Sequence, residues 1–230
     1  MTTAAQPRFE ADYEESRSRL TTFFRPLLVI PHVIVLWLWG IAAGVVVIIA
    51  WFALVVTGRY PQAMYDFVAA YLRFSTFVNG YAWLLCDPYP PYSGDASVAY
   101  PVRLLIGPPR PRYDRLKTGF RFLLAIPVVI IAYVMQIVYQ LGALLAWVAI
   151  VVTGRQPRGL QDMIVLGLSY QQRAYAYLAL VSEDWPAFTD PQPGAVGPSA
   201  TFGALPPTGP AGGSAERPAA APPDARPDAF

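Results

Sequence analysis

Two long stretches of the chain contain no Asp, Glu, Lys or Arg. They cover residues 26–58 and 122–154, and each is 33 residues long. A helix of this length would be roughly 50 Å long, whereas the hydrocarbon core of a bilayer is about 30 Å thick and needs about 20 apolar residues to cross it. Both stretches are therefore predicted to be membrane helices that are longer than the hydrocarbon core requires.

Each stretch has a proline near its start, and two arrangements of the helix in the bilayer are compatible with it. Pro31 and Pro127 each remove one backbone hydrogen bond and tend to interrupt or bend a helix. The residues before the proline can lie along the membrane interface, with the spanning part starting near the proline. Alternatively, the whole stretch forms one tilted helix with a kink. The pattern does not choose between the two arrangements.

Each apolar stretch ends in a turn and is followed by a second, less apolar helix. Glycine suits the left-handed position just past a helix, and proline suits the first turn of the next one. The turn residues are Thr57, Gly58, Arg59 and Pro61, with Thr153, Gly154, Arg155 and Pro157. The helices that follow, residues 62–86 and 158–182, either cross the bilayer inside a bundle or lie flat on its surface.

The chain repeats itself with a shift of 96 positions. Residues 20–92 align with residues 116–188 without a gap, and about a third of the aligned positions are identical. The identities include Arg, Trp, Pro, Gly and Asp, so shared apolar composition does not explain them; among them are Arg25 with Arg121 and Trp51 with Trp147. One unbroken register predicts two copies of one structural unit, each a helical hairpin.

The composition agrees with a membrane protein. The charged fraction is 14%, whereas ordinary soluble domains carry about 25%. The net charge of +2 is too small to indicate a nucleic-acid partner. One cysteine, Cys86, and one histidine, His32, cannot make an internal disulfide or a four-ligand zinc site. The sequence has no Ser-His-Asp arrangement and no Gly-rich phosphate loop, so we expect no catalytic residue, metal or cofactor.

Three segments lie outside the two units. Residues 1–19 are polar and carry both signs of charge, and residues 93–115 form a Pro- and Arg-rich linker that opens the second unit. One short apolar piece of that linker, residues 102–106, could be a strand. Residues 189–230 are dominated by Pro, Ala and Gly and are predicted to be disordered. The expected fold class is an all-α membrane protein with about four membrane helices.

The distribution of basic residues predicts an orientation in the cell membrane. Arginines cluster before each apolar stretch, whereas the turns inside the units carry only Arg59, Arg155 and Arg158. If each unit is a hairpin, both clusters face the same side, and the positive-inside tendency makes that side the cytoplasm. Both termini would then be cytoplasmic and the turns would face outward. One span per unit would instead place the two clusters on opposite faces.

These motifs resemble a bacterial membrane family known as domain of unknown function 4389. The resemblance rests on Tyr100-Pro101-Val102-Arg103, on Arg121-x-x-Leu124-Ala125-Ile126-Pro127, on the two Thr-Gly-Arg-x-Pro turns and on Asp87-x-Tyr89-Pro90-Pro91-Tyr92. The first unit departs from the pattern at its opening, Pro7-Arg8-Phe9, and the second departs at its close, Trp185-Pro186-Ala187-Phe188. The resemblance implies a multi-pass membrane protein with two tandem copies, and it implies no activity.

Four charged residues are candidates for an intramembrane polar stripe. Asp66 with Arg73, and Asp162 with Arg173, are spaced so that each pair returns to nearly the same helix face. Acids inside a membrane are costly and often functional. Within one helix each acid is too far from its arginine, so we expect Asp66 to meet Arg173 and Asp162 to meet Arg73. The alternative is that the acids sit at helix starts on the membrane edge, where the helix dipole favours them, and that the arginines reach lipid headgroups.

A second set of candidates concerns helix packing. Gly40 and Gly44 form a Gly-x-x-x-Gly pair, and the positions 96 residues later are Gln136 and Gln140. Glycine lets two backbones approach closely, and an amide in hydrocarbon needs a partner. The long helices of the two units are therefore predicted to touch at these four residues.

The sequence favours a non-enzymatic membrane component that organises or recruits partners, with the bilayer, copies of itself or other membrane proteins as its contacts. The alternative is a small oligomeric transporter or channel subunit in which the Asp/Arg stripe lines a polar path. A continuous water-filled cavity along that stripe would favour the transporter, and a closed seam would favour the first function.

Overall fold

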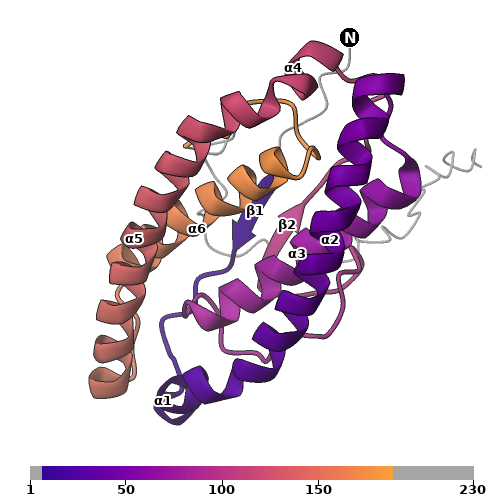
Figure 1. Cartoon of the computed structure of the whole chain (residues 1–230). Coiled ribbons are helices and arrows are strands. Elements are labelled where there is room, and N and C mark those ends of the chain that lie inside the picture. Colours follow the sequence, from indigo (N-terminus) through magenta and orange to yellow (C-terminus); the bar gives the residue numbers. More distant parts are fainter. Residues whose placement is uncertain (1–6, 189–230) are drawn as a thin grey trace, which may run out of the picture. The chain divides into compact units, whose positions relative to one another are not determined.

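The computed structural model describes residues 7–188. In chain order they form β1 (Arg8–Ala11), α1 (Arg19–Leu28), α2 (Ile30–Thr57), α3 (Gln62–Ala82), β2 (Val102–Leu105), α4 (Arg115–Gly119), α5 (Arg121–Thr153) and α6 (Arg158–Leu178) (Figure 1). The tail predicted to be disordered, residues 189–230, lies outside the described residues.

The two apolar stretches form α2 and α5, but their prolines have different effects. In the first unit the helix is interrupted at Val29, so α1 ends before it and Pro31 lies in the first turn of α2. In the second unit α5 continues through Pro127. The proline is therefore followed by a separate long helix in the first unit and lies within one continuous helix in the second.

Both long helices end at a glycine in the left-handed conformation. Gly58 has a φ angle of 69° and Gly154 one of 74°, and only glycine adopts such angles without strain. In each unit the preceding threonine hydroxyl donates to a carbonyl four residues earlier and accepts from the arginine N–H two residues later. This is the stop that the Thr-Gly-Arg-x-Pro motif predicts.

The two units face each other with their long helices running in opposite directions. The indole of Trp51, near the end of α2, donates to the carbonyl of Thr118 in α4 at 2.9 Å. Its counterpart Trp147, near the end of α5, donates to the carbonyl of Thr22 in α1 at 3.2 Å. The start of each long helix therefore lies beside the end of the other, which is the relation that an approximate two-fold axis produces.

The segment that enters each unit also completes the turn of the other unit. The backbone N–H of Arg17 donates to the carbonyl of Gly154 at 3.0 Å, and that of its counterpart Tyr113 donates to the carbonyl of Gly58 at 2.9 Å. These contacts cross between the units in both directions. The two units are therefore fastened together at both ends.

This arrangement contradicts the predicted separation of the basic clusters from the turns. A Cβ atom placed on Gly154 would lie 2.9 Å from the side chain of Arg19, and one placed on Gly58 would lie 3.3 Å from that of Arg115. Each turn thus shares an end with the basic segment of the other unit. The expected separation, with both basic clusters on one side and both turns on the other, is wrong because the units are antiparallel rather than parallel.

A small sheet corrects the all-α expectation. β1 and β2 pair antiparallel, with Glu10 opposite Arg103, and one strand lies in the segment that precedes each unit. Phe9, Val102 and Leu104 are buried on one side of the sheet, where β2 packs on α3 and β1 packs on α6. The apolar piece of the linker is therefore a strand, and the polar N-terminal segment supplies its partner.

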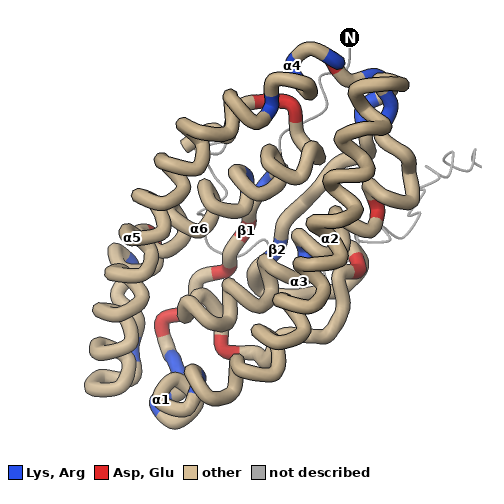
Figure 2. The backbone as a smooth tube through the Cα atoms, viewed as in Figure 1, with Lys and Arg blue, Asp and Glu red and all other residues tan. Residues whose placement is uncertain are grey.

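The inner and outer helices differ in burial. α3 and α6 lie inside and are buried along most of their length, whereas α2 and α5 expose apolar side chains from end to end. Figure 2 shows α2 without charged residues and α5 with charge only at its start. Two helices of the described residues, α2 and α5, are long and apolar enough to cross a membrane. The predicted four membrane helices are thus reduced to two candidates.

Candidate functional site

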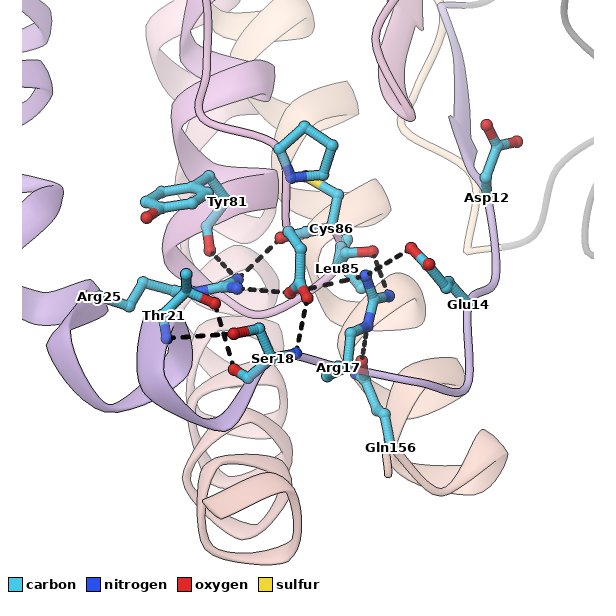
Figure 3. A network of polar contacts seen from close by, with 12 residues as sticks. Asp12, Glu14, Arg17, Ser18, Thr21, Arg25, Tyr81, Leu85, Cys86 and Gln156 are labelled. Carbon is cyan, nitrogen blue, oxygen red and sulfur yellow. Dashed lines mark hydrogen bonds and ion pairs between the residues drawn. The ribbon is translucent and has the colours of Figure 1, made fainter. Parts of the chain in front are cut away.

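A cluster of polar groups around two buried arginines joins α1 to the carboxyl end of α3. We call it the Arg17/Arg25 cluster, and Figure 3 shows how its side chains converge. It consists of the side chains of Glu14, Arg17, Ser18, Arg25, Asp87 and Gln156 and of the backbone carbonyls of Tyr81, Leu85 and Cys86.

Arg25 caps the carboxyl end of α3. Its Nη1 donates to the carbonyls of Tyr81 and Cys86, both at 2.8 Å, and its Nη2 donates to a carboxylate oxygen of Asp87 at 2.7 Å. The last carbonyls of a helix have no partner within the helix, and the negative end of the helix dipole favours a cation. Arg25 meets both needs while it is almost fully buried.

Arg17 holds three segments together. Its Nε donates to the side-chain oxygen of Gln156 at 3.0 Å, and its Nη2 donates to the carbonyl of Leu85 at 2.8 Å. Its Nη1 lies 3.6 Å from the carboxylate of Glu14 and 3.8 Å from that of Asp87. Gln156 belongs to the turn after α5, so this arginine connects the first unit to the turn of the second.

Asp87 is the carboxylate on which the cluster converges. One of its oxygens accepts from Arg25, and the other accepts from the backbone N–H of Ser18 at 3.0 Å. The hydroxyl of Ser18 in turn accepts from the N–H of Thr21 and caps the amino end of α1. One acid therefore fixes the start of α1 against the end of α3.

The second unit repeats this arrangement 96 positions later. Arg121 donates from Nε to the carbonyl of Tyr177 at 3.1 Å and from Nη2 to the carbonyls of Tyr177 and Ser182. Its guanidinium carbon lies 3.6 Å from the centre of the Tyr177 ring. The backbone N–H of Asp114 donates to the carboxylate of Glu183 at 2.7 Å, as Ser18 does to Asp87. The cap on the inner helix is thus a property of the repeated unit.

The two copies differ in how their acids are neutralised. In the second unit Arg110, from the linker, forms ion pairs with Glu183 at 3.1 Å and with Asp184. The position of Arg17 is occupied by Tyr113, whose ring lies 6.1 Å from that of Tyr60. An aromatic contact therefore replaces the buried guanidinium at this point of the second unit.

The electrostatics of the first cluster favour a fixed structural role. Burial lowers the pKa of Arg17, and the nearby charge of Asp87 opposes that change; an arginine so placed stays charged. Burial raises the pKa of Cys86 to about 11, and its thiol donates to the oxygen of Tyr100 at 3.1 Å. Within residues 7–188, no group of three or more His, Cys, Asp or Glu side chains is placed to hold a metal ion.

An open, mostly apolar cavity of about 760 Å³ lies beside this cluster, between the two units. Its lining comes from α1, α2, α3 and α5, and its polar members include Arg25, Asn79 and Gln140. Its walls are suited to an apolar group, with two amides and a guanidinium among the lining side chains. It has no nucleophile next to a base among its lining residues.

The structure does not bring the predicted Asp/Arg pairs together. Asp66 and Asp162 are exposed near the starts of α3 and α6, and Asp66 accepts a hydrogen bond from Gln62 on its own helix at 2.9 Å. Arg73 is half-buried, while Arg173 is buried and donates to Ser169 one turn earlier at 2.8 Å. The two acids thus lie at the surface near the helix starts, whereas Arg73 and Arg173 are less exposed and lie farther along the same helices.

The predicted contact between α2 and α5 is also absent from its expected place. A Cβ atom on Gly40 would meet the hydroxyl of Tyr71, on α3 of the same unit, at 3.0 Å, and one on Gly44 would meet nothing within 4 Å. Gln140 lines the cavity and Gln136 is half-buried. α2 packs mainly on α3 and α4, and α5 mainly on α6 and α1, because the inner helices lie between the two long ones.

Sequence reasoning missed the roles of three kinds of residue. Two of these kinds are the arginines Arg25 and Arg121 and the tryptophans Trp51 and Trp147. Their identity between the repeats was the one feature of the sequence that could have indicated a structural role. His32 gave no such signal, because its counterpart is Val128. It is nonetheless fully buried, with Nε2 2.8 Å from the carbonyl oxygen of Pro90 and its ring stacked on Tyr92, the ring centres being 4.0 Å apart.

The profile of one protein family matches the chain twice, over residues 19–93 and 115–190. These ranges coincide with the two units that the antiparallel arrangement brings together. No curated protein and no solved structure matches the chain. Since the two matches together cover more than half of its length, the chain belongs to the family described as domain of unknown function (DUF4389), of which it carries two tandem copies.

Proposed function

We propose that this protein is a non-enzymatic membrane component that organises or recruits partners, which are other membrane proteins or copies of itself. In this role α2 and α5 hold the chain in the lipid of the cell membrane. The Pro-, Ala- and Gly-rich segment at residues 189–230 serves as a tether for partners.

The apolar outer surface of α2 and α5 is the observation that carries this proposal. On α2 the side chains of Ile34, Ile41 and Ile48 are each more than half exposed, and they recur every seven residues along one face. Their counterparts on α5, 96 positions later, are apolar and largely exposed as well. A continuous apolar surface of this length is characteristic of a protein in contact with lipid rather than with water.

The alternative, a transporter or channel subunit, has less support. Its polar path would need Asp66 and Asp162 inside the protein, and both are exposed. Arg173, which would line that path, is bonded within its own helix. The clusters at the inner helix ends bind backbone carbonyls that belong to the fold, so they support a rigid body rather than a transport route.

Membrane residence and partner capture test the proposal together. Full-length protein is expected to stay with native membranes after washing at alkaline pH and to be released by detergent. Chemical crosslinking in those membranes, followed by affinity purification, should capture a defined set of membrane proteins. A chain lacking residues 189–230 should keep its membrane residence and lose most of that set.

Two results would count against the proposal. Release of the full-length protein by the alkaline wash would show that α2 and α5 do not hold it in lipid. Ion or solute flux through vesicles containing the purified protein, abolished by Arg173→Gln, would favour the transporter. Gly44→Ala is a suitable control in both assays because its new methyl group would point into open space.

A further inference from the structure

The part of the protein that the structure describes has two unlike faces. On α3, Gly80 faces the sheet, because a Cβ there would lie 2.8 Å from the side chain of Val102. The ring of Phe77, on the same helix, lies 5.0 Å from that of Tyr100, two residues before β2. Val78 and Ala82 of the same helix line the apolar cavity. The sheet therefore lies on one side of the inner helices, and the cavity opens on another side, between the two long helices.

The outer surface of the sheet is charged. Phe9, Val102 and Leu104 point inward, so by strand alternation Arg8, Glu10 and Arg103 point outward. Glu10 forms ion pairs with Arg8 at 3.3 Å and with Arg103 at 2.7 Å, and all three side chains are partly exposed.

The sheet lies midway along the long helices. β1 leads through five residues to Arg17 at one end of the antiparallel pair, and β2 leads through seven residues to Tyr113 at the other end. Figures 1 and 2 show the same placement of the two strands.

This placement decides against a transmembrane orientation of α2 and α5. If both helices crossed the bilayer, the sheet would lie near its mid-depth, with two arginines and a glutamate at its surface. Charged side chains at that depth are costly. α2 would also be about 42 Å long, at 1.5 Å for each of its 28 residues, in a core about 30 Å thick.

We propose that α2 and α5 lie along the plane of the membrane, embedded in one leaflet, with the sheet facing water. A helix about 10 Å across fits within the roughly 15 Å of hydrocarbon that one leaflet provides. The approximate two-fold axis then runs along the membrane normal, so both units meet the same leaflet in the same way. This orientation rests on the proposed membrane function and specifies its lipid contact.

The exposed basic residues support the same orientation. Arg19 and Arg155 lie at one end of the helix pair, and Arg59 and Arg115 lie at the other. When the pair lies flat, all four reach the headgroups of one leaflet, where anionic lipids attract them. When the pair spans, equal basic clusters would face both sides of the membrane, against the usual asymmetry.

Spin labels report the depth directly. Single cysteines replace Ile34, Ile41 and Ile48 on α2 in a Cys86→Ser background, and the labelled full-length protein is reconstituted into phosphatidylcholine vesicles with phosphatidylglycerol. Depth is measured from the relative accessibility of each label to oxygen and to a water-soluble nickel chelate. The three labels cover about 21 Å of helix.

The counterparts of these positions supply the matched set. They are Ile130, Ile137 and Leu144 on α5, and each is 43–60% exposed. They replace the α2 series if any α2 variant fails to fold. Leu105→Cys, 46% exposed on the outer surface of the sheet, supplies the label expected in water.

The expected result is one common depth for all labels on α2 and α5 and full accessibility of the Leu105 label to the nickel chelate. Labels that pass from shallow to deep to shallow along α2, with the Leu105 label in lipid, would overturn the in-plane orientation and leave the membrane function standing. Labels that are all in water, on protein that does not stay with the vesicles, would overturn both.

Discussion

The two units share one backbone plan and differ in how closely their paired helices approach. In the first unit Gly40 on α2 lies against the hydroxyl of Tyr71 on α3. In the second unit the same two positions are Gln136 and Gly167, so the glycine has moved to the inner helix. A Cβ on Gly167 would lie 2.7 Å from the backbone carbonyl oxygen of Met135 on α5.

This difference shows that one packing site can be built with the small residue on either helix. When the glycine faces the end of a tyrosine side chain, the neighbour can move. When it faces backbone, as in the second unit, the helices are held at close range and nothing can move without shifting a helix. The second hairpin is therefore expected to tolerate substitution at its helix interface less well than the first.

The largest expected difference in stability is between variants of the two arginines that cap the inner helices. Arg25→Gln removes a buried cation that is paired with Asp87, and losses of this kind cost about 3–5 kcal/mol. Arg121→Gln removes hydrogen bonds to the carbonyls of Tyr177 and Ser182; the first also accepts from the N–H of Leu180, and leaving the second unsatisfied costs about 1–3 kcal/mol. The free energy of unfolding in detergent, measured for both variants, should fall more for Arg25→Gln. A larger loss for Arg121→Gln would show that the carbonyls, not the ion pair, dominate.

The glycines provide the next test. Gly167→Ala should lower the free energy of unfolding by about 1–3 kcal/mol, because the methyl group overlaps the backbone of α5. Gly40→Ala should cost less, since the tyrosine hydroxyl can move aside. Gly44→Ala meets nothing and should stabilise α2 by up to about 1 kcal/mol through helix propensity. Equal losses for Gly167→Ala and Gly40→Ala would remove the distinction between the hairpins.

The reciprocal tryptophans should behave alike in both units. Trp51→Phe and Trp147→Phe each remove one hydrogen bond across the units, at a cost of about 1 kcal/mol. The two bonds lie at opposite ends of the helix pair, so the losses should add in the double variant. Thermal unfolding of the three variants measures this. If the double variant loses much less stability than the sum of the single losses, breaking the contact at one end already weakens the contact at the other.

The smallest effect concerns Cys86, whose counterpart in the second unit is Ser182. Cys86→Ser should change the free energy of unfolding by less than about 1 kcal/mol, because it reproduces a residue already used at this position. The pKa of the thiol is raised to about 11, so the neutral form persists well above pH 8. Alkylation at pH 8 should be far slower in the folded protein than in denaturant and should accelerate towards pH 11. Similar rates in both states would show that the thiol is not buried.

The sequence predicted the local features well. The glycine stops at Gly58 and Gly154 depend on neighbouring residues, and the existence of two units is visible in the repeat. The start of α2 at Ile30 was not predicted, because the pattern left the effect of Pro31 open. The short apolar piece of the linker was also recognised as a possible strand.

The relation between the units could not be predicted in the same way. Whether two copies pack parallel or antiparallel depends on contacts between residues far apart in the chain, such as Trp51 with Thr118, and no local pattern specifies the partner. Asp66 and Asp162 were singled out because they are charged and repeated, yet they are exposed. Arg25 and Arg121 are repeated in the same way as the two acids. They differ from the acids because they are buried against helix carbonyls, and sequence spacing does not reveal burial.

The exchange of entering segments has a consequence for assembly. A chain with one copy of this unit would leave its turn glycine without the incoming N–H and its tryptophan without the carbonyl that accepts from it. Two such chains would satisfy each other as a symmetric dimer, with a stability that depends on their concentration. Joining the copies by the linker at 93–115 makes that encounter intramolecular and fixes the effective concentration of one half for the other. The two copies in the tandem chain therefore stay associated at any protein concentration, as the two chains of such a dimer would not.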